Sequence, residues 1–175
     1  IIDKLSHPNI VKIYERGEYK GKLFLAMELI RGKSLARAIA DHGPFDLAEA
    51  LPVMKQCAQA LAFIHDKKVV HRDLKPANIL LAEEEDGKST VKLLDFGLAI
   101  VHSHSRLTRS GELVGTINYI APEQIIENLY IPPGDIYAMG VIFYEMISPV
   151  PLFQEKSIAA IIEKILDEAA LEPSQ

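Results

Sequence analysis

The chain has 175 residues, 49% of them hydrophobic, so it is long enough to form one domain with a sizeable buried core. Its formal net charge of −5 argues against a general nucleic-acid-binding or membrane-surface protein, because both need an excess of positive charge. The single cysteine, Cys57, excludes a disulfide within the chain. It fits a reducing compartment, and we therefore expect a cytoplasmic protein. A membrane anchor outside this stretch remains compatible with the sequence.

The first third of the chain is predicted to contain a β-hairpin followed by a long helix. Residues 11–15 and 23–29 have the composition of strands, and Lys20-Gly21-Lys22 between them has that of a turn. Apolar residues then recur at helical spacing over residues 47–65, with Asp46 as the expected N-cap.

Three short strands are predicted in the middle of the chain. Residues 69–70 and 79–81 are brief apolar runs on either side of a polar segment, and residues 91–94 form a third run. The acidic stretch 83–89 contains a glycine, which predicts an exposed hairpin tip rather than a metal site.

The last third is predicted to be helical. Residues 141–147 are apolar nearly all round, as in a helix that is buried within a domain. This run is too short for a transmembrane segment and contains Glu145. A final amphipathic helix is marked by isoleucines at helical spacing, namely Ile158, Ile161, Ile162 and Ile165.

Two motifs in the middle of the chain have a pattern suited to phosphoryl transfer. Residues 71–78 read His-Arg-Asp-Leu-Lys-Pro-Ala-Asn, and residues 95–97 read Asp-Phe-Gly. Together they supply a candidate base, a cation to face a phosphate and two candidate metal ligands. In this order the motifs resemble the catalytic core of eukaryotic-type protein kinases, which occur in eukaryotes and bacteria.

The resemblance implies a role for each polar residue of the motifs. Asp73 would orient the substrate hydroxyl and accept its proton, and Lys75 would face the γ-phosphate, as in kinases that act on Ser/Thr rather than Tyr. Asn78 and Asp95 would hold Mg²⁺, a hard cation that prefers oxygen ligands. Thr116 would contact Asp73 and Lys75 and shape the pocket beside the phosphoacceptor.

The same resemblance implies an adenine site in the N-terminal third. Met27 would be the gatekeeper, and Glu28, Leu29 and Ile30 would form the hinge, which binds adenine through backbone groups. Leu80 would lie under the adenine as its floor. Without the downstream motifs, these residues would be interpreted as ordinary core positions.

Further resemblance concerns regulation and support of the catalytic loop. Residues 95–123 correspond to an activation segment, in which Thr108 and Ser110 are the best candidate phosphorylation sites. A phosphate there would pair with Arg72 through charge-assisted hydrogen bonds. Asp135 would brace the backbone of the catalytic loop, whereas His65 is expected only to end a helix or lie at the surface.

The expected fold is α+β, a protein-kinase-like two-lobed fold in truncated form. Residues 1–30 would be a remnant of a β small lobe with its hinge, and residues 31–175 a mainly helical large lobe without its last helices. The Gly-rich loop and the small-lobe Lys of this family are not in the sequence. We therefore expect a fragment that is inactive alone.

The parent protein is expected to be an ATP- and Mg²⁺-dependent Ser/Thr protein kinase. Its partners would be ATP and protein substrates, with no nucleic acid and no membrane segment in this chain; the sequence does not indicate an oligomeric state. The alternative is a non-catalytic pseudokinase or scaffold module, and a small-molecule kinase is a lesser one.

Overall fold

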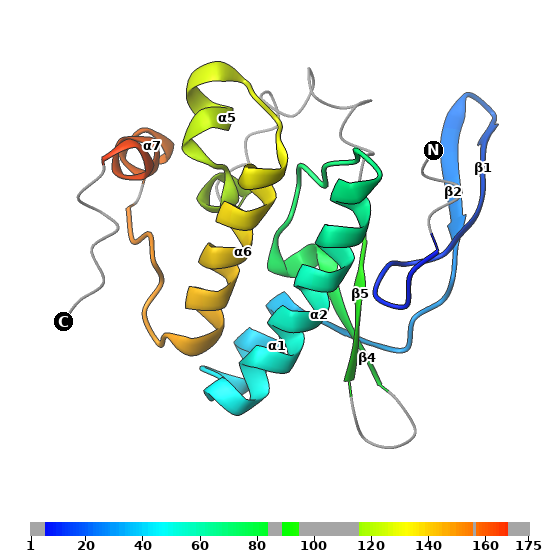
Figure 1. Ribbon diagram of the computed structural model, residues 1–175, viewed down its shortest axis with the longest axis horizontal. Coiled ribbons are helices and arrows are strands. Elements are labelled where there is room, and N and C mark those ends of the chain that lie inside the picture. The colour runs from blue at the N-terminus through cyan, green and yellow to red at the C-terminus, as the bar shows by residue number, and fades with distance from the viewer. Residues whose placement is uncertain (1–5, 84–88, 95–115, 156, 168–175) are drawn as a thin grey trace.

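The computed structural model describes residues 6–83, 89–94, 116–155 and 157–167 of the chain. Strands dominate the N-terminal part and helices the remainder, which confirms the mixed α+β class. Figure 1 shows the hairpin of β1 and β2 at one side of the molecule and α7 at the opposite side, with α2 and α6 packed against each other between them.

The first sheet is the predicted hairpin. Strand β1 (Ile13–Tyr19) pairs antiparallel with β2 (Lys22–Met27), and Tyr19 lies opposite Lys22. The two turn residues, Lys20 and Gly21, have φ values of 50° and 74°. Positive φ at both positions is the requirement of a type I′ turn, whose twist matches that of the strands.

The second sheet has three antiparallel strands in the order β3-β4-β5, formed by β3 (Gly32–Ser34), β4 (Ile79–Glu83) and β5 (Ser89–Leu93). The β4–β5 pairing was predicted from the sequence, whereas β3 was not. Gly32 makes the β3–β4 contact sterically feasible, because a Cβ at this position would lie 2.0 Å from the carbonyl oxygen of Leu81.

The strand predicted at residues 69–70 is absent from the described structure. The amide of Val69 instead donates to the carbonyl of Ile64 over 2.9 Å and so closes the end of the preceding helix. Residues 69–70 therefore belong to the turn that ends the helix, and in the described structure they pair with no strand. The short run alone could not distinguish these two outcomes.

Two helices form the first layer beside this sheet, α1 (Leu35–His42) and α2 (Leu47–Asp66). The predicted N-cap of α2 is confirmed, since the amide of Glu49 donates to Asp46 Oδ1 over 2.8 Å and the amide of Asp46 donates to Glu49 Oε2 over 3.1 Å. This reciprocal capping box satisfies two backbone donors at the start of the helix.

Helix α6 (Pro132–Ile147) separates two hydrophobic cores. Its Ile142 and Met146 belong to the main core with α2, β4 and β5, while Val141 belongs to a smaller core with α7 (Ile158–Leu166). The helix is apolar nearly all round because it contributes to both cores. Helix α5 (Pro122–Glu127) precedes it and packs against α7.

The close approach at Gly32 predicts a large cost for any side chain there. Gly32→Ala should lower the free energy of unfolding by at least about 2 kcal/mol, because the strand backbone must move to avoid the clash. Gly140→Ala is the matched control: no heavy atom lies within 4 Å of its added Cβ, so alanine should raise stability by up to about 1 kcal/mol. Urea unfolding followed by circular dichroism measures both. Equal effects would contradict the steric explanation.

Candidate active site

The catalytic-motif loop, residues 71–78, is hydrogen-bonded to a buried carboxylate on α6. Asp135 is 2% exposed, and its Oδ2 and Oδ1 accept hydrogen bonds from the amides of His71 and Arg72 over 2.9 and 3.0 Å. Arg72 has a left-handed backbone with φ of 70°. The two bonds to one carboxylate help to hold this unfavourable conformation in place. The predicted bracing role of Asp135 is therefore seen directly.

A histidine completes this junction. His65, in the last turn of α2, places Nε2 2.7 Å from Asp135 Oδ2. Three segments that are distant in sequence thus meet at one carboxylate: the end of α2, the loop and the first turn of α6. The predicted position of His65 at a helix end is confirmed, but its contact with Asp135 was not predicted, because no local pattern reports a partner 70 residues away.

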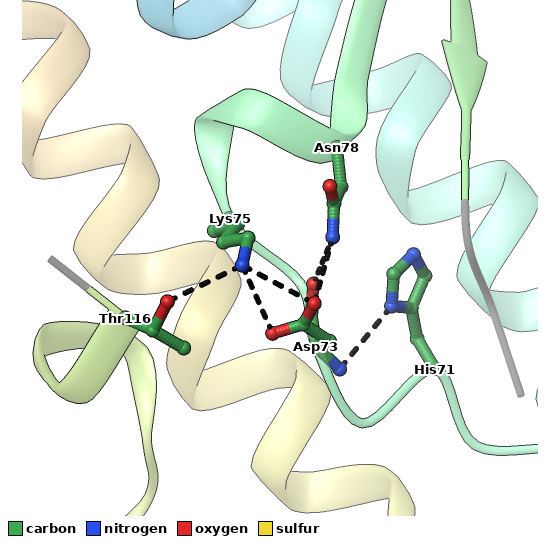
Figure 2. A network of polar contacts seen from close by, with 5 residues as sticks. All are labelled: His71, Asp73, Lys75, Asn78 and Thr116. Carbon is green, nitrogen blue, oxygen red and sulfur yellow. Dashed lines mark hydrogen bonds and ion pairs between the residues drawn. The ribbon is translucent and has the colours of Figure 1, made fainter. Parts of the chain in front are cut away.

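Four of the predicted catalytic residues form a polar cluster, in which Asp73, Lys75 and Asn78 come from the loop and Thr116 from a separate segment (Figure 2). Lys75 Nζ lies 3.2 Å from Asp73 Oδ2 and 3.3 Å from Oδ1, and it donates to Thr116 Oγ1 over 3.2 Å. The side chains of Asp73 and Lys75 are 8% and 22% exposed. Their attraction is therefore less screened by solvent than that of a surface pair. The predicted contact between Thr116 and Lys75 is confirmed.

Asn78 fixes the other side of the Asp73 carboxylate. Its Nδ2 donates to Asp73 Oδ2 over 3.1 Å and to the Asp73 carbonyl over 2.8 Å. Figure 2 shows that the amide oxygen of Asn78 consequently points away from Asp73. An amide oxygen in this orientation suits a hard cation such as Mg²⁺. The loop thus presents one oxygen of the kind that the implied metal prefers.

The second implied ligand, Asp95, lies outside the described residues, as do Thr108 and Ser110. Leu94, the last described residue before Asp95, donates its amide to the Asn78 carbonyl over 2.9 Å. The strand that leads to the second motif is therefore tied to the end of the first motif.

The segment that carries Thr116 is anchored to α6 by a partly buried polar pair. The hydroxyl of Tyr119 donates to Glu145 Oε2 over 2.7 Å. Burial raises the pKa of Tyr119 above its ordinary value, and the Glu145 carboxylate adds to this effect. Burial also raises the pKa of Glu145, although the hydrogen bond from Tyr119 opposes the rise. This pair was not identified from the sequence.

The predicted hinge residues link β2 to β3. Met27 is the last residue of β2, and Glu28, Leu29 and Ile30 follow without regular structure, with Leu29 90% exposed. Leu80 lies in β4, directly opposite Ser34 of β3 on one side and Lys92 of β5 on the other. The predicted hinge thus precedes β3, which pairs with the strand that carries the predicted adenine floor.

Arg72 also contacts the segment that precedes α6. Its guanidinium lies 5.7 Å from the centroid of the Tyr130 ring, which is within the range of a cation–π interaction. The arginine that would meet an activation-segment phosphate is thereby held on the segment just before α6.

The fold and the site together define a protein kinase domain. The family model "Protein kinase domain" matches residues 1–174, and the chain belongs to this family.

Similar proteins come from bacteria and eukaryotes alike. The chain is 36% identical over 162 residues to the serine/threonine-protein kinase PrkC of Bacillus subtilis, covering 93% of the chain and 24% of that protein. It is 36% identical over 172 residues to the serine/threonine-protein kinase PknD of Mycobacterium tuberculosis, with 98% and 25% covered. For calcium-dependent protein kinase 5 of Plasmodium berghei, the identity is 39% over 165 residues, with 94% and 29% covered. The chain thus spans about a quarter of the length of these relatives.

Within the described ranges, no helix is both long enough and apolar enough to cross a bilayer. The same residues contain no group of three or more His, Cys, Asp or Glu side chains that could hold a metal ion by themselves.

The Asp135 junction predicts that a single atom change will be costly. Asp135→Asn replaces one of the two acceptor oxygens by an NH2 donor that faces a backbone amide donor, so we expect the free energy of unfolding to fall by about 2–4 kcal/mol. Asp66→Asn, at an exposed site on the neighbouring α2, should change it by less than about 0.5 kcal/mol. Urea unfolding measures both variants. A loss below 1 kcal/mol for Asp135→Asn would show that the loop does not depend on this brace.

Proposed function

We propose that the protein containing this chain is a Ser/Thr protein kinase that transfers the γ-phosphoryl group of ATP to hydroxyl groups of protein substrates. The observation that supports this most strongly is the cluster of Asp73, Lys75, Asn78 and Thr116, in which a carboxylate, a cation and an amide meet at one loop. Phosphoryl transfer needs little covalent work from the protein, so positioned charges of this kind account for most of the catalysis.

Each residue of the cluster has a proposed part in the reaction. Asp73 orients the acceptor hydroxyl and takes its proton as the oxygen attacks the γ-phosphorus. The bond from that phosphorus to the β–γ bridging oxygen breaks, and ADP leaves. Lys75 donates hydrogen bonds to the transferred group and stabilises its charge, while Asn78 and Asp95 would hold Mg²⁺. The metal, when bound, neutralises charge that develops on the phosphate oxygens.

The nucleotide is proposed to lie between the hinge and the catalytic loop. Backbone groups of Glu28, Leu29 and Ile30 would bind the adenine, with Met27 and Leu80 beside it. In this proposal residues 1–30 belong to the small lobe and hinge, and residues 31–175 to the large lobe. Ser/Thr rather than Tyr acceptors are supported by Lys75 and by the names of the bacterial relatives.

The first experiment measures Mg²⁺-dependent transfer from γ-labelled ATP to the protein itself and to a generic Ser/Thr substrate. The full-length protein is assayed beside the 175-residue chain. We expect transfer by the full-length protein that stops when Mg²⁺ is chelated. Folded full-length protein without any transfer would contradict the proposal and favour a pseudokinase scaffold.

Removing the proposed base should abolish most of the activity and little of the stability. In the full-length protein, Asp73→Asn is expected to lower turnover by at least about 100-fold, because the amide cannot accept the proton. Asp41→Asn, which breaks only the exposed pair with Arg37 on α1, should leave turnover unchanged. Thermal unfolding confirms that both variants fold. Turnover of Asp73→Asn near that of the unsubstituted protein would show that Asp73 is not the base.

The candidate phosphorylation sites remain a prediction, supported by the position of Arg72 on the loop. Phosphopeptide mapping of the autophosphorylated protein should find phosphate between residues 102 and 116, at Thr108 or Ser110 first. Arg72→Gln should then weaken the activation that accompanies this modification, since the charge-assisted partner is lost. Phosphate found solely elsewhere in the protein would exclude this mode of regulation.

A further inference from the structure

An ion pair connects the hinge to the strand that leads to the second catalytic motif. Lys92 Nζ lies 2.8 Å from Glu28 Oε1, and 64 residues separate the two in sequence. The same oxygen accepts a hydrogen bond from the amide of Lys12 over 2.9 Å. The amide of Glu28 in turn donates to the Lys12 carbonyl over 2.9 Å. One hinge residue therefore joins the segment before β1 and strand β5 to the linker.

The pair is largely shielded from solvent. The side chains of Lys92 and Glu28 are 18% and 22% exposed, unlike those of an ordinary surface salt bridge. Burial by itself raises the pKa of Glu28, but the hydrogen bonds from Lys92 and from the Lys12 amide outweigh it and leave the pKa below its ordinary value. The carboxylate is thus held in its charged form by the groups around it.

Lys92 lies close to two parts of the proposed nucleotide site, the predicted adenine floor and the catalytic loop. Lys92 lies opposite Leu80, the predicted adenine floor, in the β4–β5 register. Two residues further along, Leu94 donates to the Asn78 carbonyl of the catalytic loop. Strand β5 thus reaches the proposed hinge through Lys92, and Leu94, the residue that follows the strand, reaches the loop.

The hairpin that carries the proposed hinge is joined to the second sheet at the segment before β1 and at Glu28. Strands β1 and β2 form a sheet of their own, separate from the β3-β4-β5 sheet. The segment before β1 reaches β5 through reciprocal backbone bonds, in which Val11 donates to the Leu93 carbonyl and Leu93 donates to the Asn9 carbonyl. The Glu28–Lys92 pair adds a side-chain tie at this same open end of the hairpin, where Glu28 lies beside Lys12.

We propose that the Glu28–Lys92 ion pair is a positioning device for the nucleotide, which holds residues 28–30 at a fixed place relative to Leu80 and the catalytic loop. This inference rests on the proposed function, because it takes the linker to be the adenine-binding segment. Neither side chain need touch the nucleotide. The pair acts through the backbone of the linker, so its loss should weaken nucleotide binding without slowing phosphoryl transfer once ATP is bound.

The test uses the full-length protein with Lys92→Met, Glu28→Gln and the double variant. Each should raise the KM for ATP by about fivefold and leave kcat within twofold, because a mispositioned hinge removes binding that substrate and transition state share. The double variant should resemble the single variants rather than multiply them, as expected for partners in one interaction. Lys92→Arg, which retains the charge, should restore most of the affinity.

Lys164→Met provides the matched control. Lys164 pairs with Glu155 over 2.9 Å on the α7 side of the molecule, so breaking this pair removes a comparable interaction far from the hinge. We expect no change in the KM for ATP. A parallel fall of kcat and stability in the hinge variants, or a rise of kcat, would overturn the positioning role.

A binding measurement separates failure of this inference from failure of the proposed function. The Kd of a fluorescent ATP analogue, measured with Mg²⁺ and without turnover, should rise about fivefold in Lys92→Met. Tight binding that is unchanged by Lys92→Met would overturn the inference while the kinase assignment stands. Absence of nucleotide binding in the unsubstituted protein would overturn both.

Discussion

The arrangement of the site depends on one buried carboxylate. Asp135 receives the amides of His71 and Arg72 and the imidazole of His65, so three segments converge on a charge that is removed from water. A buried carboxylate is tolerated only when its lone pairs are satisfied, and the backbone donors of the loop equally need acceptors. Each side of this junction therefore stabilises the other, and the loop conformation follows from it.

The polar cluster above this junction is assembled from two directions. Asp73, Lys75 and Asn78 come from a single loop, and their relative positions follow from the short turn that ends it. Thr116 comes from a separate segment, which the partly buried Tyr119–Glu145 hydrogen bond ties to α6. Because α6 also carries Asp135, one helix supports both halves of the cluster. Its place between two cores makes it a rigid support, since packed interiors deform little.

The parts of the structure that the sequence predicted are those with local signals. The N-cap at Asp46 and the Lys20-Gly21 turn depend on residues a few positions apart, and the catalytic motif occupies one continuous loop. The parts that it missed depend on distant partners. His65 is an ordinary helix-end residue until α6 is packed against it, and β3 exists only because Gly32 lets it approach β4. The apolar run at 69–70 had strand composition but no partner strand.

Strand β5 offers a physical reason why the two ends of the proposed nucleotide site could act together. Successive side chains of a strand point to opposite faces. Leu93 is fully buried in the core, which fixes the register of β5. The Lys92 side chain beside it reaches the proposed hinge, and the backbone amide of Leu94, just after the strand, reaches the catalytic loop. A shift of this strand would therefore move both contacts at once. A nucleotide held at its adenine by the hinge and at its phosphates by the loop would then be aligned by one element rather than two.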